Sequence, residues 1–224
     1  MRTRSIAGIP LLLLSLASVQ AQINTLDRPV NSLFQFGAGA FLGLPFETGS
    51  LSYRLETISA EVVDFGGPTP AFTVHLYLGD ADFRPTGASL ATFSLAGPAL
   101  PSLSGPGLPD AAVFTPTLPI ILAAKTAYVF TIEPTAGNLG WLETSAANGF
   151  TTSLADPWQA PAGLINSGDS GASWMSLAEG SYPFREMSKI DATAVTVPEP
   201  ATMTVITGSL LAGLAAWRRR SVSV

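Results

Sequence analysis

The sequence predicts an all-β, antiparallel body of the β-sandwich or jelly-roll-like kind, with a signal peptide before it and a short transmembrane helix after it. Three observations carry this prediction. Several segments alternate apolar and polar residues with a period of two, glycine and proline separate these segments, and an uncharged apolar run lies near each end of the chain. Period-two alternation bounded by turn residues is typical of strands, and several such strands in succession indicate a sandwich or jelly roll.

The N-terminal run has the layout of a secretory signal peptide. Arg2 and Arg4 precede an apolar stretch centred on Leu11–Leu14, and the small-residue pattern Val-Gln-Ala ends it at Ala21. A buried N-terminal helix is the alternative, but the basic start and the small-residue end both favour export. We therefore expect the Sec machinery to export the chain and cleavage to fall between Ala21 and Gln22.

Strand periodicity is clearest over residues 71–78, where apolar and polar side chains take opposite faces. Further strands are expected over 58–62, ahead of a Gly-Gly-Pro turn, and over 90–95, 128–132 and 184–195. The glycine- and proline-rich segment 97–109 cannot be helical. It is interpreted as a surface crossover between sheets, with a ligand-binding loop as the alternative.

Composition narrows the possible partners and sites. Between the two ends lie about 175 residues, enough for one domain with its own core. Six basic and fifteen acidic residues give this body a net charge near −9, which argues against nucleic acid and against anionic membrane surfaces as partners. The chain has no cysteine, so no disulfide holds it, and its single histidine, His75, excludes a multi-histidine metal site.

Two carboxylates one residue apart, Asp80 and Asp82, are the candidates for a cation site. Hard cations such as Ca²⁺ bind carboxylate oxygens, but the glycine and glutamate of an EF-hand do not follow. A solvated turn at a strand end is the simpler interpretation. No metal and no cofactor is therefore predicted.

The stretch Ser167-Gly-Asp-Ser-Gly-Ala-Ser-Trp174 predicts a tight hairpin. Asp169 can accept hydrogen bonds from nearby backbone N–H groups, Gly171 can adopt a positive φ, and Trp174 can pack under the turn. The pattern is similar to the Asp-box of sialidase-like propellers, where it is a structural device. Propellers repeat the motif in each blade, whereas this chain has one copy, so the resemblance implies a hairpin and no glycosidase.

No catalytic signature is found, and the chain is not predicted to be an enzyme. His75 has no G-x-S-x-G elbow to supply a nucleophile. Paired carboxylates for glycoside cleavage stay open, because fifteen acids allow many pairs. Trp141, Trp158 and Trp174 are expected in core or hairpin packing, with stacking on sugar rings as the alternative.

The C-terminal run predicts a short membrane span. Residues 201–217 are uncharged, and as a helix they would extend about 25 Å, against a hydrocarbon core of about 30 Å. Arg218, Arg219 and Arg220 follow directly, and such a cluster stays in the cytoplasm by the positive-inside rule. The body is therefore expected outside the inner membrane.

Pro198-Glu199-Pro200 stands just before this span. The prolines fix φ and push the preceding residues toward extended geometry, so the tripeptide is a stiff peptide that a protease can hold. This tripeptide, the apolar helix and the arginine cluster together resemble the PEP-CTERM sorting signal. The resemblance implies cutting near Pro-Glu-Pro by an exosortase, a membrane-embedded protease that releases or re-anchors its substrates. An ordinary single-pass anchor is the alternative.

The order of features in the body resembles the choice-anchor type of bacterial extracellular domain. The features are Val74–Tyr77, Leu90–Phe93, Leu122–Phe130, Gly140-Trp141 and Asn166–Trp174. That family implies a location and a fold, and no chemistry.

The expected organisation is a signal peptide over 1–21, a lead-in over 22–45, a β-sandwich over 46–195 and a sorting tail over 196–224. We expect a non-catalytic protein of a Gram-negative-type bacterium, anchored transiently in the inner membrane and then placed at the cell surface or in a biofilm matrix. Exopolysaccharide is the further partner expected there. A lectin or carbohydrate-active enzyme on the same scaffold is the alternative function.

Overall fold

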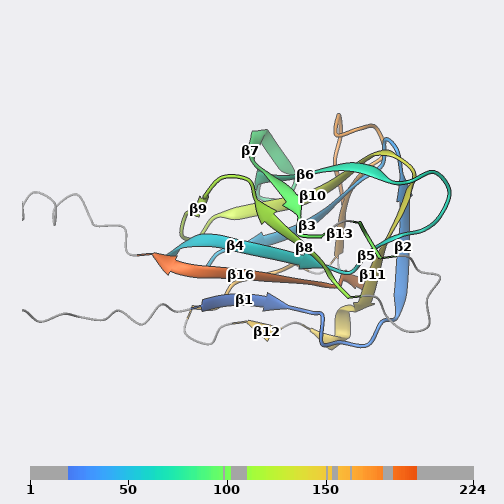
Figure 1. The fold of residues 1–224 in the computed structure, drawn as a ribbon. Coiled ribbons are helices and arrows are strands. Elements are labelled where there is room, and N and C mark those ends of the chain that lie inside the picture. The colour runs from blue at the N-terminus through green and yellow to red at the C-terminus, as the bar shows by residue number, and fades with distance from the viewer. Residues whose placement is uncertain are drawn as a thin grey trace, which may run out of the picture.

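The computed structural model describes residues 20–97, 99–101, 110–149, 151–152, 156–161, 163–178 and 184–195. These residues form an all-β fold of antiparallel sheets, as the sequence predicts. A larger, 12-stranded sheet curls into a half-barrel, and a 4-stranded sheet lies against one end of it (Figure 1). A short 3-10 helix, Ala146–Asn148, follows the strand that ends at Ser145.

The larger sheet brings together strands from both ends of the chain. Its order is β12 (Thr151–Thr152), β1 (Gln20–Asn24), β16 (Ser188–Val195), β4 (Ser52–Ala60), β8 (Ala112–Pro116), β7 (Pro85–Leu95), β6 (Ala71–Gly79), β10 (Ala127–Ala136), β3 (Phe41–Glu47), β13 (Gly163–Ser167) and β14 (Met175–Ala178), and β9 (Ile121–Leu122) also pairs with β4. The smaller sheet has β11 (Asn138–Ser145) between β15 (Phe184–Glu186) and β2 (Ser32–Gly37), with β5 (Val62–Asp64) also on β11.

The core fills the inside of the curled sheet and is rich in aromatic side chains. Phe130 on β10 lies at its centre, with ring centroids 5.3 Å from Phe93, 5.6 Å from Phe114 and 6.5 Å from Trp141. The alternation expected over 71–78 supplies part of this core. Val74 and Leu76 are buried, but Leu78 at the strand end is 40% exposed. The larger sheet therefore turns its apolar face inward, as period-two patterning requires.

Two segments that read as single strands are each divided between the two sheets. The segment around 58–62 changes sheets at Glu61, between β4 and β5, and the segment 184–195 changes sheets at Met187, between β15 and β16. Backbone hydrogen bonds join these two residues to each other and to Leu142 of β11. They run from Glu61 N to Met187 O (3.0 Å), from Leu142 N to Glu61 O (2.9 Å) and from Met187 N to Leu142 O (2.8 Å). The two strands thus bend together at one corner.

The expected boundary between lead-in and body falls inside a strand. Residues 22–45 provide most of β1, all of β2 and most of β3, and β3 continues to Glu47. Because β3 lies between β10 and β13, the lead-in residues are part of the same sheets as the rest of the body.

No helix within the described part of the chain combines the length and the apolar character that crossing a membrane requires. The span expected over 201–217 lies outside the described residues.

Candidate functional site

The sorting signal, Pro198, Glu199, Pro200 and Arg218–Arg220, lies outside the described residues. The expected cleavage point between Ala21 and Gln22 lies within β1, where these residues pair with Ala192 and Asp191 of β16. Cleavage there would leave Ile23 and Asn24 in the sheet. Ile23 is 1% exposed, so the residue that anchors β1 in the core would stay with the mature chain.

The first and last strands bring both terminal segments to one end of the domain. β1 begins at Gln20, which pairs with Thr193, and β16 ends at Val195, which pairs with Ser52. Because β1 and β16 are antiparallel neighbours, β1 begins and β16 ends at the same end of the sheet, at the left of Figure 1. We call this the exit end.

The stretch around Asp169 forms the turn of the β13–β14 hairpin. Asp169 accepts hydrogen bonds from Ser173 N (2.8 Å), Ser173 Oγ (2.6 Å) and Ser167 Oγ (2.7 Å). These bonds, led by those from Ser173, lower the pKa of Asp169 to about 2. Gly171 adopts a φ of +83°, and the Trp174 ring lies 6.3 Å from that of Phe41. Both carboxylate oxygens of Asp169 accept hydrogen bonds within the turn, so the geometry is that of a structural hairpin.

Asp80 and Asp82 lie in the turn between β6 and β7. Asp80 Oδ1 accepts hydrogen bonds from the backbone of Asp82 and of Arg84, both at 2.8 Å. Asp82 forms an ion pair with Arg84 at 3.5 Å. Across the described residues, no three potential ligands among His, Cys, Asp and Glu converge in a way that could hold a metal ion. Both carboxylates therefore serve the turn itself.

His75 belongs to a polar cluster on the outer face of β6 and β10. Its Nδ1 lies 3.0 Å from Ser89 Oγ, and its Nε2 lies 3.9 Å from Glu133 Oε2. Ser89 Oγ donates its proton to Ala91 O (2.9 Å), whereas a nucleophilic serine must donate to the imidazole. Glu133 also accepts from Tyr77 Oη (3.1 Å), and burial together with this carboxylate raises the pKa of Tyr77 to about 12. The cluster has serine, histidine and acid, but its hydrogen bonds run the wrong way for a catalytic triad.

Two of the tryptophans that could have stacked on sugars are in the core. Trp141 is fully buried, and its Nε1 donates to Met187 O (3.2 Å) at the corner between the sheets. Trp158 is 2% exposed and stacks on Phe46, with centroids 5.6 Å apart and planes 8° apart. Neither ring offers a face to a ligand.

Asp156 is a buried anchor that no sequence pattern indicates. This carboxylate accepts hydrogen bonds from Tyr53 Oη (2.5 Å), Ser50 N (2.6 Å), Ser50 Oγ (2.8 Å) and Leu51 N (3.1 Å). Burial alone would raise the pKa of Asp156, but these donors outweigh it and lower the pKa. Asp156 thus fastens the segment before Trp158 to the start of β4.

A second feature that sequence reasoning missed is a pair of buried acids. Glu143 of β11 and Glu186 of β15 are directly opposite each other, and they are 0% and 3% exposed. Burial, reinforced by the Glu143 carboxylate, raises the pKa of Glu186 to about 8, although its own backbone and Arg185 act in the opposite direction. Glu186 Oε1 accepts no hydrogen bond from the described residues. Glu186 is therefore mainly protonated at neutral pH.

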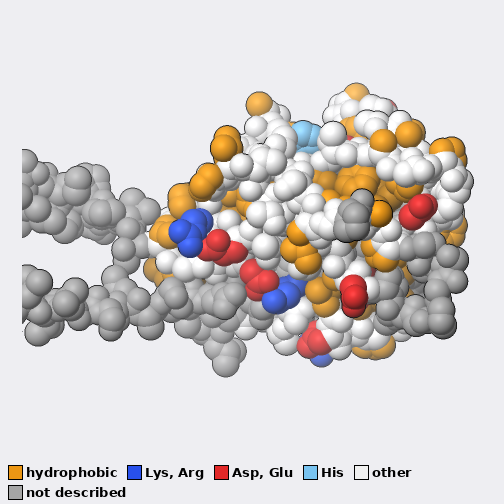
Figure 2. Space-filling model, in the orientation of Figure 1, with side chains coloured by type: hydrophobic (Ala, Val, Ile, Leu, Met, Phe, Trp, Pro, Cys, Tyr) orange, Lys and Arg blue, Asp and Glu red, His pale blue; other side chains and the backbone are white. Residues whose placement is uncertain are grey.

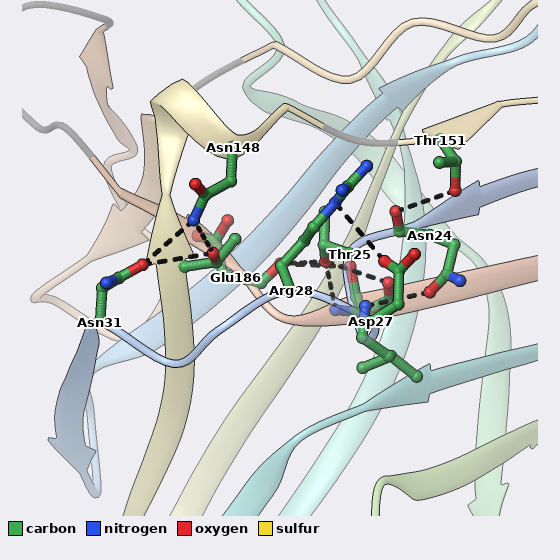
Figure 3. A network of polar contacts seen from close by, with 11 residues as sticks. Asn24, Thr25, Asp27, Arg28, Asn31, Asn148, Thr151 and Glu186 are labelled. Atoms are coloured by element: carbon green, nitrogen blue, oxygen red, sulfur yellow. Dashed lines mark hydrogen bonds and ion pairs between the residues drawn. The ribbon is translucent and has the colours of Figure 1, made fainter.

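A network of polar contacts near Glu186 joins the segment after β1 to the end of β11 and to β15 (Figure 3). Thr25 Oγ1 donates to the carbonyl oxygens of Glu186 (3.0 Å) and Ser188 (3.1 Å). Asn31 Oδ1 accepts from Ser145 N (2.9 Å) and Asn148 Nδ2 (3.2 Å). The network consists of structural hydrogen bonds that hold the segment after β1 against the ends of β11 and β15.

No family model matches this chain, and no curated protein matches its sequence.

Proposed function

We propose that this chain is an exported, surface-sorted, non-catalytic protein of the bacterial envelope or exopolysaccharide matrix. In this proposal the Sec machinery exports it and an exosortase processes it near Pro198-Glu199-Pro200, as the PEP-CTERM resemblance implies. It is anchored in the inner membrane of a Gram-negative-type bacterium until processing releases it to the cell surface or matrix.

The observation that carries the proposal is the shared exit of the two terminal segments. Gln20 pairs with Thr193, and Val195 pairs with Ser52, so a membrane-bound segment at either end leaves the rest of the body on one side of the attachment point. This arrangement suits a domain displayed from a surface. A cut at Pro-Glu-Pro would leave β16 whole, since β16 ends at Val195, ahead of Pro198.

The fold supports the same function. We propose that the curled sheet and the smaller sheet form a jelly-roll-like sandwich, because strands change sheets at Glu61 and Met187, as they do in sandwiches with bent corners. The choice-anchor type is implied by the sequence resemblance alone. The burial of Trp141 and Trp158 is the reason for preferring a non-catalytic function over the lectin or glycosidase alternative.

Processing can be tested by exchanging the two determinants of the tail separately. Replacing Pro198 and Pro200 with alanine should leave membrane insertion unchanged and block cutting, because the stiff extended peptide is lost. Replacing Arg218–Arg220 with serine should instead weaken retention and orientation. A membrane-fraction blot in the native host distinguishes these outcomes, and processing of the proline variant at the wild-type rate would contradict the proposal.

A further inference from the structure

Three large apolar side chains are exposed beside the exit end. Leu51, Leu118 and Ile121 are 43%, 74% and 50% exposed, and we call them the exit-end patch. Leu51 directly precedes β4, and the segment that carries Leu118 and Ile121 runs along the first half of that strand. Leu55 N donates to Ile120 O (3.1 Å), and Ile121 pairs with Arg54.

The exit-end patch lies close to the point where the C-terminal segment leaves. Val195, the last residue of β16, pairs with Ser52, which follows Leu51. Arg54 pairs with Ile121 on one side and Thr193 on the other, so Ile121 and β16 are two strand spacings apart, about 10 Å. Figure 2 shows hydrophobic side chains along this edge, with a basic and an acidic side chain next to them.

The tether to the predicted span is short. Five residues, 196–200, separate β16 from the apolar run that begins at Ala201. Fully extended they reach at most about 17 Å, and the headgroup layer on each side of a bilayer is about 5–8 Å thick. A domain on such a tether keeps its exit end at the lipid surface. The body is strongly acidic, and Arg54 beside the patch forms an ion pair with Glu56 (2.8 Å), so the attractive contact available there is apolar.

We propose that the exit-end patch lies in the interfacial layer of the bilayer while the tail is inserted. This inference rests on the proposed function, because it requires the segment 201–217 to span the membrane. The patch would tilt the body so that β4 and β9 face the lipid, and this would fix the position at which the Pro-Glu-Pro peptide is presented. The partner is the phospholipid surface itself.

The absence of cysteine allows single labelling sites in the full-length chain. Leu118→Cys and Ile121→Cys carry an environment-sensitive fluorophore, and Met175→Cys is the matched control. Met175 is 55% exposed and lies near the opposite end of β3, since Asn166 pairs with both Met175 and Leu42. Each labelled protein is reconstituted into phosphatidylcholine vesicles with and without brominated acyl chains. We expect blue-shifted emission and roughly twofold or greater quenching at both patch sites, and neither at Met175.

A fourth variant, Leu210→Cys in the predicted span, separates failure of this inference from failure of the proposed function. Quenching at Leu210 without quenching at Leu118 and Ile121 would overturn the lipid contact and leave the membrane tail intact. No quenching at Leu210 would overturn both. Equal quenching at Met175, or a blue shift at the patch that brominated lipid does not quench, would also overturn the contact. The latter result would indicate a protein partner, such as a second copy of the chain.

Discussion

Glu143 and Glu186 face each other across the β11–β15 pair, and both carboxyl groups are almost wholly buried. Directly opposite residues of an antiparallel pair have Cβ atoms about 4.5–5.5 Å apart and point to the same side. Two ionised carboxylates at that separation in a dry site would repel each other strongly. The pair is tolerated because Glu186 keeps its proton, as the rise of its pKa to about 8 indicates.

The first prediction is that Glu186 makes the fold less stable as the pH rises. Its pKa is about 8 in the folded protein and about 4.5 in the unfolded chain. As the pH rises, the unfolded chain therefore loses this proton at a lower pH than the folded protein does. The resulting loss of unfolding free energy is absent below about pH 4.5, grows as the pH rises and levels off above about pH 8, at a total on the order of 5 kcal/mol. Glu186→Gln should therefore stabilise the protein at pH 7.5 and change little at pH 4.5.

Denaturant unfolding at the two pH values measures this difference. Glu143→Gln should act in the same direction, because it removes the charge that helps to raise the pKa of Glu186. If Glu186→Gln shifts stability by the same amount at both pH values, the effect comes from packing, and folding does not raise the pKa of Glu186.

The second prediction concerns Asp156, whose pH dependence has the opposite sign. Its pKa in the folded protein lies below the usual value. Its contribution to the free energy of unfolding is therefore present above about pH 3.8 and is lost as the pH falls through the folded pKa. Asp156→Asn should destabilise the fold by about 2–4 kcal/mol at pH 7, since an amide cannot accept from Tyr53, Ser50 and Leu51 together. Asp110→Asn, at an exposed position, is the control and should have little effect on the melting temperature.

The third prediction concerns the β13–β14 hairpin. Gly171 has a φ of +83°, and a Cβ there would lie 3.3 Å from the Phe41 ring. Gly171→Ala should cost about 1–2 kcal/mol, because the turn needs left-handed backbone where the ring leaves little room. Gly168→Ala, in the same turn, meets nothing within 4 Å and should be close to neutral. Equal melting temperatures for the two variants would mean that the turn rearranges freely.

Much of the fold could be predicted because its signals are local. The period-two pattern over 71–78 is visible in the sequence, and the same alternation buries Val74 and Leu76 in β6. The glycine, aspartate and serine residues from Ser167 to Ser173 likewise carry their own turn chemistry. Each of these features depends on residues within one strand or one turn.

The corner between the sheets could not be predicted, because neither glutamate nor methionine is a residue type that indicates the end of a strand. Neither glycine nor proline stands at these positions, and the bend depends on backbone bonds to Leu142, far away in the chain. The acid pair was missed for a related reason. A glutamate in a strand usually indicates an exposed face, and only the pairing of β11 with β15 places Glu143 beside Glu186.

We propose that the chain is trimmed at both ends during export. The most direct test is the intact mass of the protein recovered from the surface or medium of the native host, followed by sequencing of its terminal peptides. We predict a chain that begins at Gln22, within a few residues, and ends near Pro198-Glu199-Pro200, without the apolar run and the arginine cluster. Recovery of a surface protein that retains Arg218–Arg220 would contradict the claim and leave the tail as a plain membrane anchor.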